Sequence, residues 1–132
     1  MGGYLPASTP EDPRESGLRS HVQVAPETAS AMHLMHERIC KSIGDPKRLL
    51  IIQLLRDHEL NVGEIAESLQ ISQSNASQHL GVLRDRGVVL TRREGTTIHY
   101  RLASPRIVEA IDLMRAFLEE SVTAPGVSGE GT

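Results

Sequence analysis

Two stretches of this sequence gather side chains that can form hydrogen bonds with nucleic acid. The first offers hydroxyl, amide and imidazole groups that suit the edges of bases, from Ser72, Gln73, Ser74, Asn75, Ser77, Gln78 and His79. The second offers two guanidinium groups and two hydroxyls that suit phosphate oxygens, from Arg92, Arg93, Thr96 and Thr97. These residue types predict that the first stretch reads bases in double-stranded DNA and that the second contacts the backbone beside it.

The charge distribution supports this interpretation, although the net charge of the chain is −3. Residues 71–106 contain six arginines against one aspartate and one glutamate, a local charge of +4, whereas residues 107–132 carry −4. Phosphates respond to the local field, so the positive stretch matters more than the total. A polar helix surface alone is most often only solvated, and the neighbouring elements and charge are what favour DNA binding.

The hydrophobic pattern predicts the elements that position the first stretch. Asp45 and Pro46 are a helix cap and a first-turn proline, and the following KRLLIIQLLRD is apolar on nearly every side, as in a central helix. Residues 61–69 form a short helix with Asn61 as cap, and a second helix starts with Ser72 as cap and ends at Gly87. Two short helices joined by a tight turn form a helix-turn-helix.

The second stretch lies in a predicted β-hairpin. Within the stretch from Val88 to Leu102 the pattern changes to a two-residue period, in which Ile98, Tyr100 and Leu102 alternate with polar residues, and Glu94-Gly95 supplies the turn. A hairpin placed directly after a helix-turn-helix is a wing. Helices of residues 28–42 and from Ser104-Pro105 onward flank this unit, and the last one is so apolar that it needs a partner.

The fold class is therefore expected to be mainly α with a small β-hairpin, a winged helix-turn-helix over residues 28–122. Residues 1–27 and 123–132 are rich in Pro, Ser, Gly and Glu and are expected to be disordered tails. No apolar run is long enough to span a membrane and no signal peptide is recognisable, so a cytoplasmic protein is expected. The few aromatic residues argue against single-strand binding by base stacking.

Neither catalysis nor a cofactor is expected. No nucleophile, base and orienting acid occur at a telling spacing, and there is no glycine-rich phosphate loop. His58 is expected to favour a helix end and His99 to face solvent. The single cysteine, Cys40, cannot form a disulfide within the chain, so a disulfide would have to join two chains.

The segments DPKRLLIIQLL, LNVGEIAESLQISQSNASQHLGVLRDRGVV and REGTTIHYRL resemble the arsenic-repressor (ArsR) family of winged-helix regulators over about residues 30–120. This resemblance implies a homodimer built from the first and last helices. It also implies a repressor that binds a palindromic operator as a homodimer and is released by an inducer. In the family the positions of Gln73, Ser74, Ser77, Gln78, His79 and the wing arginines face DNA.

The known sensor sites of the family do not carry over to this chain. Family members that bind metal through a Cys-x-Cys pair have it where this chain has Asn61 and Gly63. The zinc and nickel site of the last helices corresponds to Ser104, Arg106, Phe117 and Glu120, of which only the glutamate can be a ligand. The chain looks most like the branch that senses reactive sulfur or oxidants through a pair of cysteines. At the positions of that pair this chain has Gln53 and, approximately, Glu119. The inducer, the operator and the regulated genes stay undetermined.

Two alternatives stay open. His33, His36 and Cys40 are spaced i, i+3, i+7 on one predicted helix, so they could form a metal-responsive or redox-responsive sensor, although chance placement is the simpler explanation and no fourth ligand is evident. The winged helix could instead be a protein-interaction module without DNA binding. An arginine-rich wing beside a Gln/Ser helix opposes that second alternative.

Overall fold

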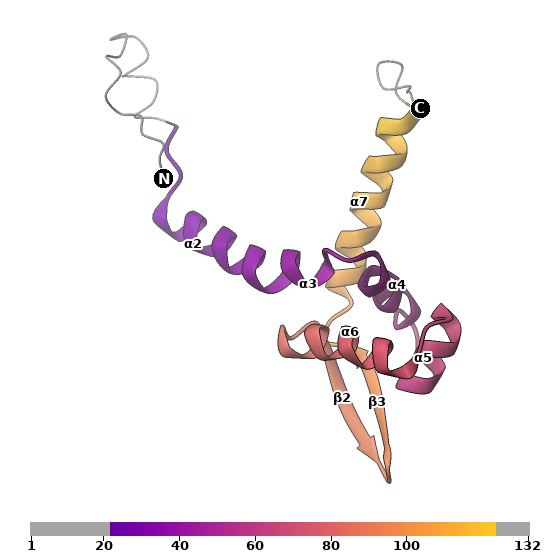
Figure 1. Ribbon diagram of the computed structural model, residues 1–132. Coiled ribbons are helices and arrows are strands. Elements are labelled where there is room, and N and C mark those ends of the chain that lie inside the picture. The colour runs from indigo at the N-terminus through magenta and orange to yellow at the C-terminus, as the bar shows by residue number, and fades with distance from the viewer. Residues whose placement is uncertain (1–21, 124–132) are drawn as a thin grey trace, which may run out of the picture. The chain divides into compact units, whose positions relative to one another are not determined.

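The computed structural model describes residues 22–123. Its elements are, in order, α2 (Pro26–Met35), the π-helical turn η1 (His36–Cys40), α3 (Lys41–Ile43), α4 (Pro46–Leu54), β1 (Leu60–Asn61), α5 (Val62–Leu69), α6 (Gln73–Asp85), β2 (Val89–Glu94), β3 (Thr97–Leu102) and α7 (Arg106–Thr123) (Figure 1). The chain divides into two compact units, Met1–Leu34 and Met35–Thr132. Each unit is described by itself.

The first unit contributes most of α2. This helix buries none of its residues, and Met32 and Leu34 are 49% and 55% exposed. The sequence predicted a helix start near Thr28 and an apolar face that includes Met32, and the helix begins two residues earlier, at Pro26.

The second unit opens with a departure from the predicted helix geometry. The sequence predicted a uniform α-helix up to Ser42, but His36–Cys40 form a π-helical turn. The backbone carbonyl of Glu37, inside that turn, accepts a hydrogen bond from the guanidinium of Arg86 at the end of α6. Because a π turn holds more residues than an α turn, side-chain positions computed from α-helical spacing do not apply here.

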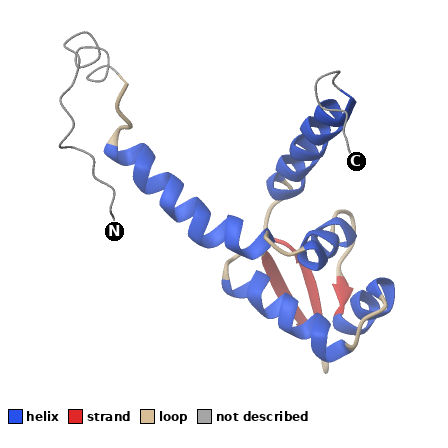
Figure 2. Cartoon of the chain, turned by 45° about the horizontal axis from the view of Figure 1, so that its top comes forward, coloured by secondary structure: helices blue, strands red, loops and turns tan. Residues whose placement is uncertain are grey.

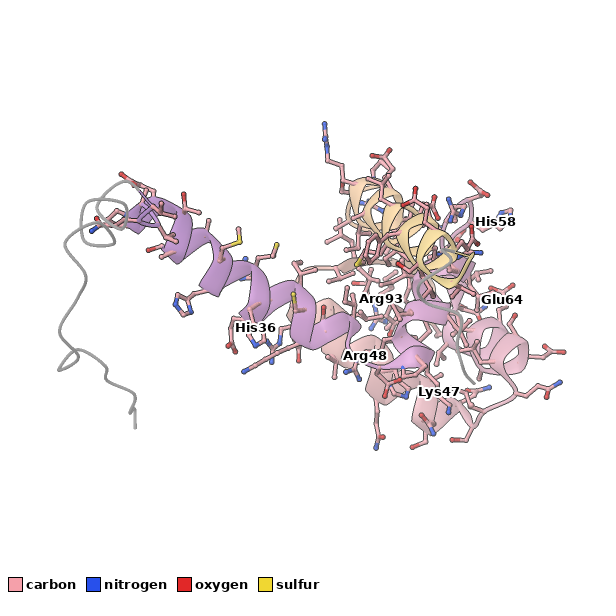
Figure 3. All side chains as sticks on the ribbon, turned by 90° about the horizontal axis from the view of Figure 1, so that it is seen from above. His36, Lys47, Arg48, His58, Glu64 and Arg93 are labelled. Atoms are coloured by element: carbon pink, nitrogen blue, oxygen red, sulfur yellow. The ribbon has the colours of Figure 1, made fainter. Side chains whose placement is uncertain are left out.

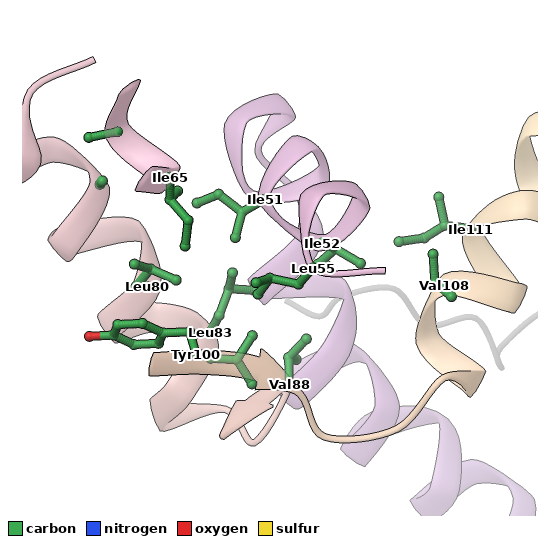
Figure 4. Close-up of a cluster of buried hydrophobic side chains, with 13 residues drawn as sticks. Ile51, Ile52, Leu55, Ile65, Leu80, Leu83, Val88, Tyr100, Val108 and Ile111 are labelled. Carbon is green, nitrogen blue, oxygen red and sulfur yellow. The ribbon is translucent and has the colours of Figure 1, made fainter. Parts of the chain in front are cut away.

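The core of the second unit lies between α4, α5, α6, the sheet and the start of α7. Asp45 caps α4 by accepting from the Lys47 amide at 2.8 Å, with Pro46 in the first turn, as the sequence predicted. The buried apolar side chains are Ile51, Ile52, Leu55, Ile65, Ala66, Ala76, Leu80, Leu83, Val88, Val89, Tyr100, Val108 and Ile111 (Figure 4). They confirm the predicted central helix, although Leu50 of that helix is 52% exposed.

The wing belongs to a three-stranded antiparallel sheet with the order β1-β3-β2. The predicted hairpin is confirmed: Val89 pairs with Leu102 at one end of its register and Glu94 with Thr97 at the other. Figure 2 shows the short third strand, β1, beside this hairpin, where Leu60 pairs with Tyr100 and Asn61 with His99. The expectation that His99 faces solvent was wrong, because this pairing and Glu94 leave only 21% of its side chain exposed.

The first turns of the last helix pack against the core. Ser104 caps it by accepting from the Arg106 amide at 3.1 Å, and Val108 and Ile111 are buried against α4 (Figure 4). Arg56 donates to both carboxylate oxygens of Asp112, at 2.9 and 2.7 Å. These hydrogen bonds hold the pKa of Asp112 below its ordinary value. Beyond this anchor the predicted apolar stripe is exposed.

The predicted tails fall mostly outside the described residues, since residues 1–21 and 124–132 are not part of the description. Within residues 22–123 no helix is both long enough and apolar enough to cross a membrane.

Two glycines of the helix-turn-helix region provide a matched test of backbone conformation. Gly81 lies within α6 and Gly87 follows it with φ +79°, and at both positions the space for a Cβ is open. Gly81→Ala should therefore raise the free energy of unfolding by about 0.5–1 kcal/mol, because alanine is the better helix former. Gly87→Ala should lower it by about 1–2 kcal/mol, because a Cβ is strained in the left-handed region. Urea unfolding at one fixed protein concentration measures both, and shifts of the same sign would contradict the backbone explanation.

Candidate nucleic-acid interface

The two helices of the helix-turn-helix are positioned by side-chain caps. At the start of α5 the Asn61 side chain accepts from the Glu64 amide at 2.8 Å, and the Glu64 carboxylate accepts from the Asn61 amide at 2.9 Å. At the start of α6 the Ser72 hydroxyl accepts from the Asn75 amide at 3.0 Å. Between the helices, Gln70 adopts a left-handed conformation with φ 57° and closes the turn. These caps agree with the sequence prediction.

The second helix, α6, has one apolar face and one polar face. Ala76, Leu80 and Leu83 are each 0% exposed and tie the helix to the core. The opposite side is exposed and carries Gln73, Ser74, Asn75, Ser77 and Gln78. Because the buried stripe fixes the rotation of the helix, the predicted base-reading side chains of this helix point away from the core.

The wing and α6 meet at one open groove of 440 Å³. Gln73 and Ser77 line it from α6, and Thr96 and Thr97 line it from the wing, together with Asn61, Val62, Gly63, Ile98 and Tyr100. Four side chains that the sequence predicts to contact DNA, two from each stretch, thus lie around the same groove. Gly63 lies against this groove, where a Cβ would lie 3.3 Å from Oδ1 of Asn61, a tight contact, and 3.4 Å from the side-chain amide nitrogen of Gln73.

The two wing arginines differ in their surroundings. Arg92 donates to Glu59 at 3.0 and 2.7 Å and also lies 3.4 Å from Glu94. Hydrogen bonds from Arg92 are the main reason that the pKa of Glu59 lies below its ordinary value, with His99 and Arg101 adding to the effect. Arg93 is exposed and has no ion pair within residues 22–123. The sequence does not distinguish the two cations, because nothing in it indicates that Glu59 reaches the wing.

His79, the remaining predicted contact on α6, is half-buried at the edge of the polar face. Its Nδ1 lies 3.2 Å from Nη1 of Arg48, which the sequence analysis did not single out. An arginine at the start of a neighbouring helix carries no sequence signal for such a contact.

The metal or redox alternative gains no support from the described part of the chain. Among residues 22–123, no three His, Cys, Asp or Glu side chains are grouped to hold a metal ion. His36 and Cys40 delimit the π turn, so the α-helical spacing that suggested a shared face does not hold between them. Cys40 is exposed and is not in a disulfide.

The three-stranded sheet, the two capped helices and the hairpin beside them define a winged helix-turn-helix. Residues 45–91 match the model of the bacterial regulatory protein arsR family. The transcriptional activator HlyU of Vibrio cholerae is 42% identical over 76 residues, which cover 58% of this chain and 70% of that protein. The biofilm growth-associated repressor of Agrobacterium fabrum is 41% identical over 78 residues, which cover 59% of this chain and 67% of that protein.

A solved structure gives the same result for the fold. The homodimeric winged helix-turn-helix DNA-binding domain of Mb0332 from Mycobacterium bovis superposes with a TM-score of 0.64 and 28% identity, covering 75% of this chain and 91% of that domain. The chain therefore belongs to the arsR family of bacterial regulatory proteins. It is a transcriptional regulator and not an enzyme, which confirms that part of the sequence prediction.

The ion pair between Glu59 and the wing predicts a specific dependence of stability on pH. The pKa of Glu59 is lowered from an ordinary value of 4.5 in the folded state. Its contribution to stability should therefore be complete above that value and lost as the pH falls through the lowered value. Glu59→Gln should destabilise the protein relative to wild type at pH 7, and the difference should shrink in acid.

Urea unfolding of both proteins between pH 7 and pH 3 measures this effect. Glu67→Gln is the matched control, because Glu67 is exposed on α5 and has no ion pair in the described part of the chain. If the free energies of unfolding of Glu59→Gln and wild type differ by the same amount at all pH values, the charge of Glu59 does not stabilise the fold.

Proposed function

We propose that this protein is a sequence-specific DNA-binding transcriptional repressor that binds a palindromic operator as a homodimer. The observation that carries the proposal is the shared groove in which Gln73 and Ser77 of α6 lie beside Thr96 and Thr97 of the wing. This arrangement puts base-reading side chains and a backbone-contacting hairpin on one surface, as winged regulators require.

In the proposed complex, α6 enters the major groove and the wing lies along the neighbouring backbone. The glutamine amides of Gln73 and Gln78 suit the paired donor and acceptor of adenine, and the serine hydroxyls suit several base edges. Ser72 contributes mainly by capping α6. At the wing, Arg93 has its charge available for phosphate, whereas the charge of Arg92 is offset by Glu59.

A homodimer is supported by the apolar side chains that the single chain leaves exposed. On α7, Leu113 is 73% exposed, Phe117 69% and Leu118 61%. On α2, Met32 and Leu34 are also exposed. Apolar surface of this extent is covered in a stable protein, and a second copy offers the same helices for that purpose. Two recognition helices related by a two-fold axis would read two half-sites, so a palindromic operator is proposed.

Repression would follow directly from this binding at an operator that overlaps a promoter, because the bound dimer would then block the polymerase. The relatives include one named an activator and one named a repressor, so their names alone do not decide the direction of control. We propose repression with release by an inducer of unidentified chemistry, acting in the cytoplasm, where bacterial operators are found.

The first experiment is an anisotropy titration against the DNA upstream of the protein's own gene, with and without Zn²⁺ and with and without an oxidant. We expect specific, salt-sensitive binding, and an additive that abolishes it would identify the class of inducer. Failure to prefer this DNA or any selected sequence over random DNA would favour the protein-interaction alternative.

Three variants separate base reading from backbone binding. Gln78→Ala should cost about 1–3 kcal/mol of discrimination at one base position and leave the others unchanged. Arg93→Ala should weaken binding evenly on all sequences and lower the slope of log K against log salt by about 1. Arg92→Ala should change that slope less, because Glu59 already offsets its charge. Equal slopes for the two arginine variants would contradict the assignment of the wing.

The dimer can be tested on α7. Phe117→Glu introduces a charge into the exposed apolar surface and should weaken self-association by at least about tenfold, or 1.4 kcal/mol. Leu90→Glu is the control, because Leu90 is 39% exposed on β2, away from α7. Sedimentation velocity measures the change, and a Phe117→Glu variant that stays dimeric would place the interface elsewhere.

A further inference from the structure

One arginine connects the recognition helix with the segment that precedes the helix-turn-helix. Arg48 lies in the first turns of α4 (Figure 3). Its Nε donates to the backbone carbonyl of Ser42, and its Nη2 donates to that of Lys41 at 3.4 Å. Its Nη1 lies 3.2 Å from Nδ1 of His79 on α6. Three elements, α3, α4 and α6, therefore meet at one guanidinium group.

The chemistry of that group determines the role of Nδ1 of His79 in the hydrogen bond. A guanidinium has N–H donors and no acceptor, so the hydrogen bond requires Nδ1 of His79 to accept. An imidazole that accepts at Nδ1 is neutral and carries its proton on Nε2. The contact thus selects one of the two neutral tautomers and leaves an N–H donor at the far side of the ring.

Asp45 is an acidic group close enough to this pair to interact with it electrostatically, but its side chain is engaged elsewhere. Asp45 caps α4, and its Oδ1 accepts from the Lys47 amide at 2.8 Å. That hydrogen bond is the main reason that the pKa of Asp45 lies below its ordinary value, and the positive charge of Arg48 contributes to it. Asp45 therefore stabilises the first turn of α4, from which Arg48 extends. Its Oδ1 is engaged in this helix cap.

The position of His79 would allow its Nε2–H group to donate a hydrogen bond to DNA. Asn75, one helical turn earlier, is exposed on the polar face, and His79 is half-buried at its edge. Side chains at the edge of a recognition helix meet the DNA backbone, whose phosphate oxygens accept hydrogen bonds only. A neutral ring with the proton on Nε2 is a donor of fixed direction for such an oxygen.

We propose that Arg48 is a positioning residue for DNA recognition, which holds His79 in the Nε2–H tautomer as a hydrogen-bond donor to a DNA phosphate. This inference rests on the proposed function. Lysine cannot replace Arg48 in this role, because one ammonium group cannot reach three acceptors in the planar arrangement of a guanidinium.

The chain offers a matched control in Arg86. This arginine also links the helix-turn-helix to the preceding segment, since it donates to the backbone carbonyl of Glu37 and lies 3.4 Å from the Glu37 carboxylate. It makes no contact with His79 among the described residues. Arg86→Met therefore removes a comparable link without removing the partner of the histidine.

The first measurement uses the free protein, so its outcome does not depend on DNA binding. The ¹⁵N shifts of the ring nitrogens distinguish the two neutral tautomers, and the His79→Gln variant assigns the signal. We expect the Nε2–H tautomer at pH 8 in wild type and in Arg86→Met, and a mixture in Arg48→Met and Arg48→Lys. A wild-type ring protonated on Nδ1, or a tautomer that Arg48→Met leaves unchanged, would overturn the inference.

The second measurement is operator affinity. Arg48→Met and His79→Ala should each weaken binding by about tenfold, and the double variant should lose little more than either one. His79→Asn keeps an acceptor near the Nδ1 position and should bind as weakly as His79→Ala. His79→Gln places an amide N–H near the Nε2 position and should recover part of the affinity. Arg86→Met should bind within about twofold of wild type.

The outcomes separate this inference from the proposed function. A wild-type protein that binds no operator would overturn both, whereas a wild type that binds and additive losses from Arg48→Met and His79→Ala would overturn the inference alone. Equal losses from Arg48→Met and Arg86→Met would also overturn it, because they would show that Arg48 acts only by supporting the fold.

Discussion

The candidate interface depends on the burial of one apolar stripe of α6. Ala76, Leu80 and Leu83 pack against the core formed with Ile51 and Ile65, and each is fully buried. This contact fixes how α6 is rotated about its axis, so the polar residues between the buried positions have to face outward. A cavity in this stripe would loosen the direction of every side chain on the opposite face.

Electrostatics then decides which of the outward groups are available. The local charge of +4 in residues 71–106 suggested a uniformly basic wing. In the fold, Glu59 precedes β1, lies beside β2 and β3, and pairs with Arg92 and, at 3.8 Å, with Arg101. The interaction therefore ties Arg92 and Arg101 of the wing to the segment before β1 and leaves Arg93 exposed. Local charge in the sequence overestimates the charge that a phosphate would meet.

The described unit also contains two arginines that join elements of the fold. Arg48 of α4 joins α6 to backbone carbonyls of α3, and Arg56, just after α4, contacts α7 through both oxygens of Asp112. In the proposed dimer, α7 would carry the contact with the second copy.

The sequence by itself determined the elements, because their signals are local. The caps at Asp45, Asn61 and Ser72, the turn at Gly95 and the apolar period of α6 involve residues only a few positions apart, and all are present in the structure. The outward residues of α6 followed from the same period. The family could be recognised for the same reason, since its motifs are continuous stretches of chain.

Only the tertiary structure decided which side chains meet across long separations. The contact between Arg48 and His79 spans 31 positions, that between Arg92 and Glu59 33, and that between Arg86 and Glu37 49. The two-residue strand β1 and the π turn are likewise too short, or too dependent on distant partners, to leave a periodic signal. Such contacts depend on how the packed core places the elements relative to one another. The residue types along the chain do not by themselves reveal that placement.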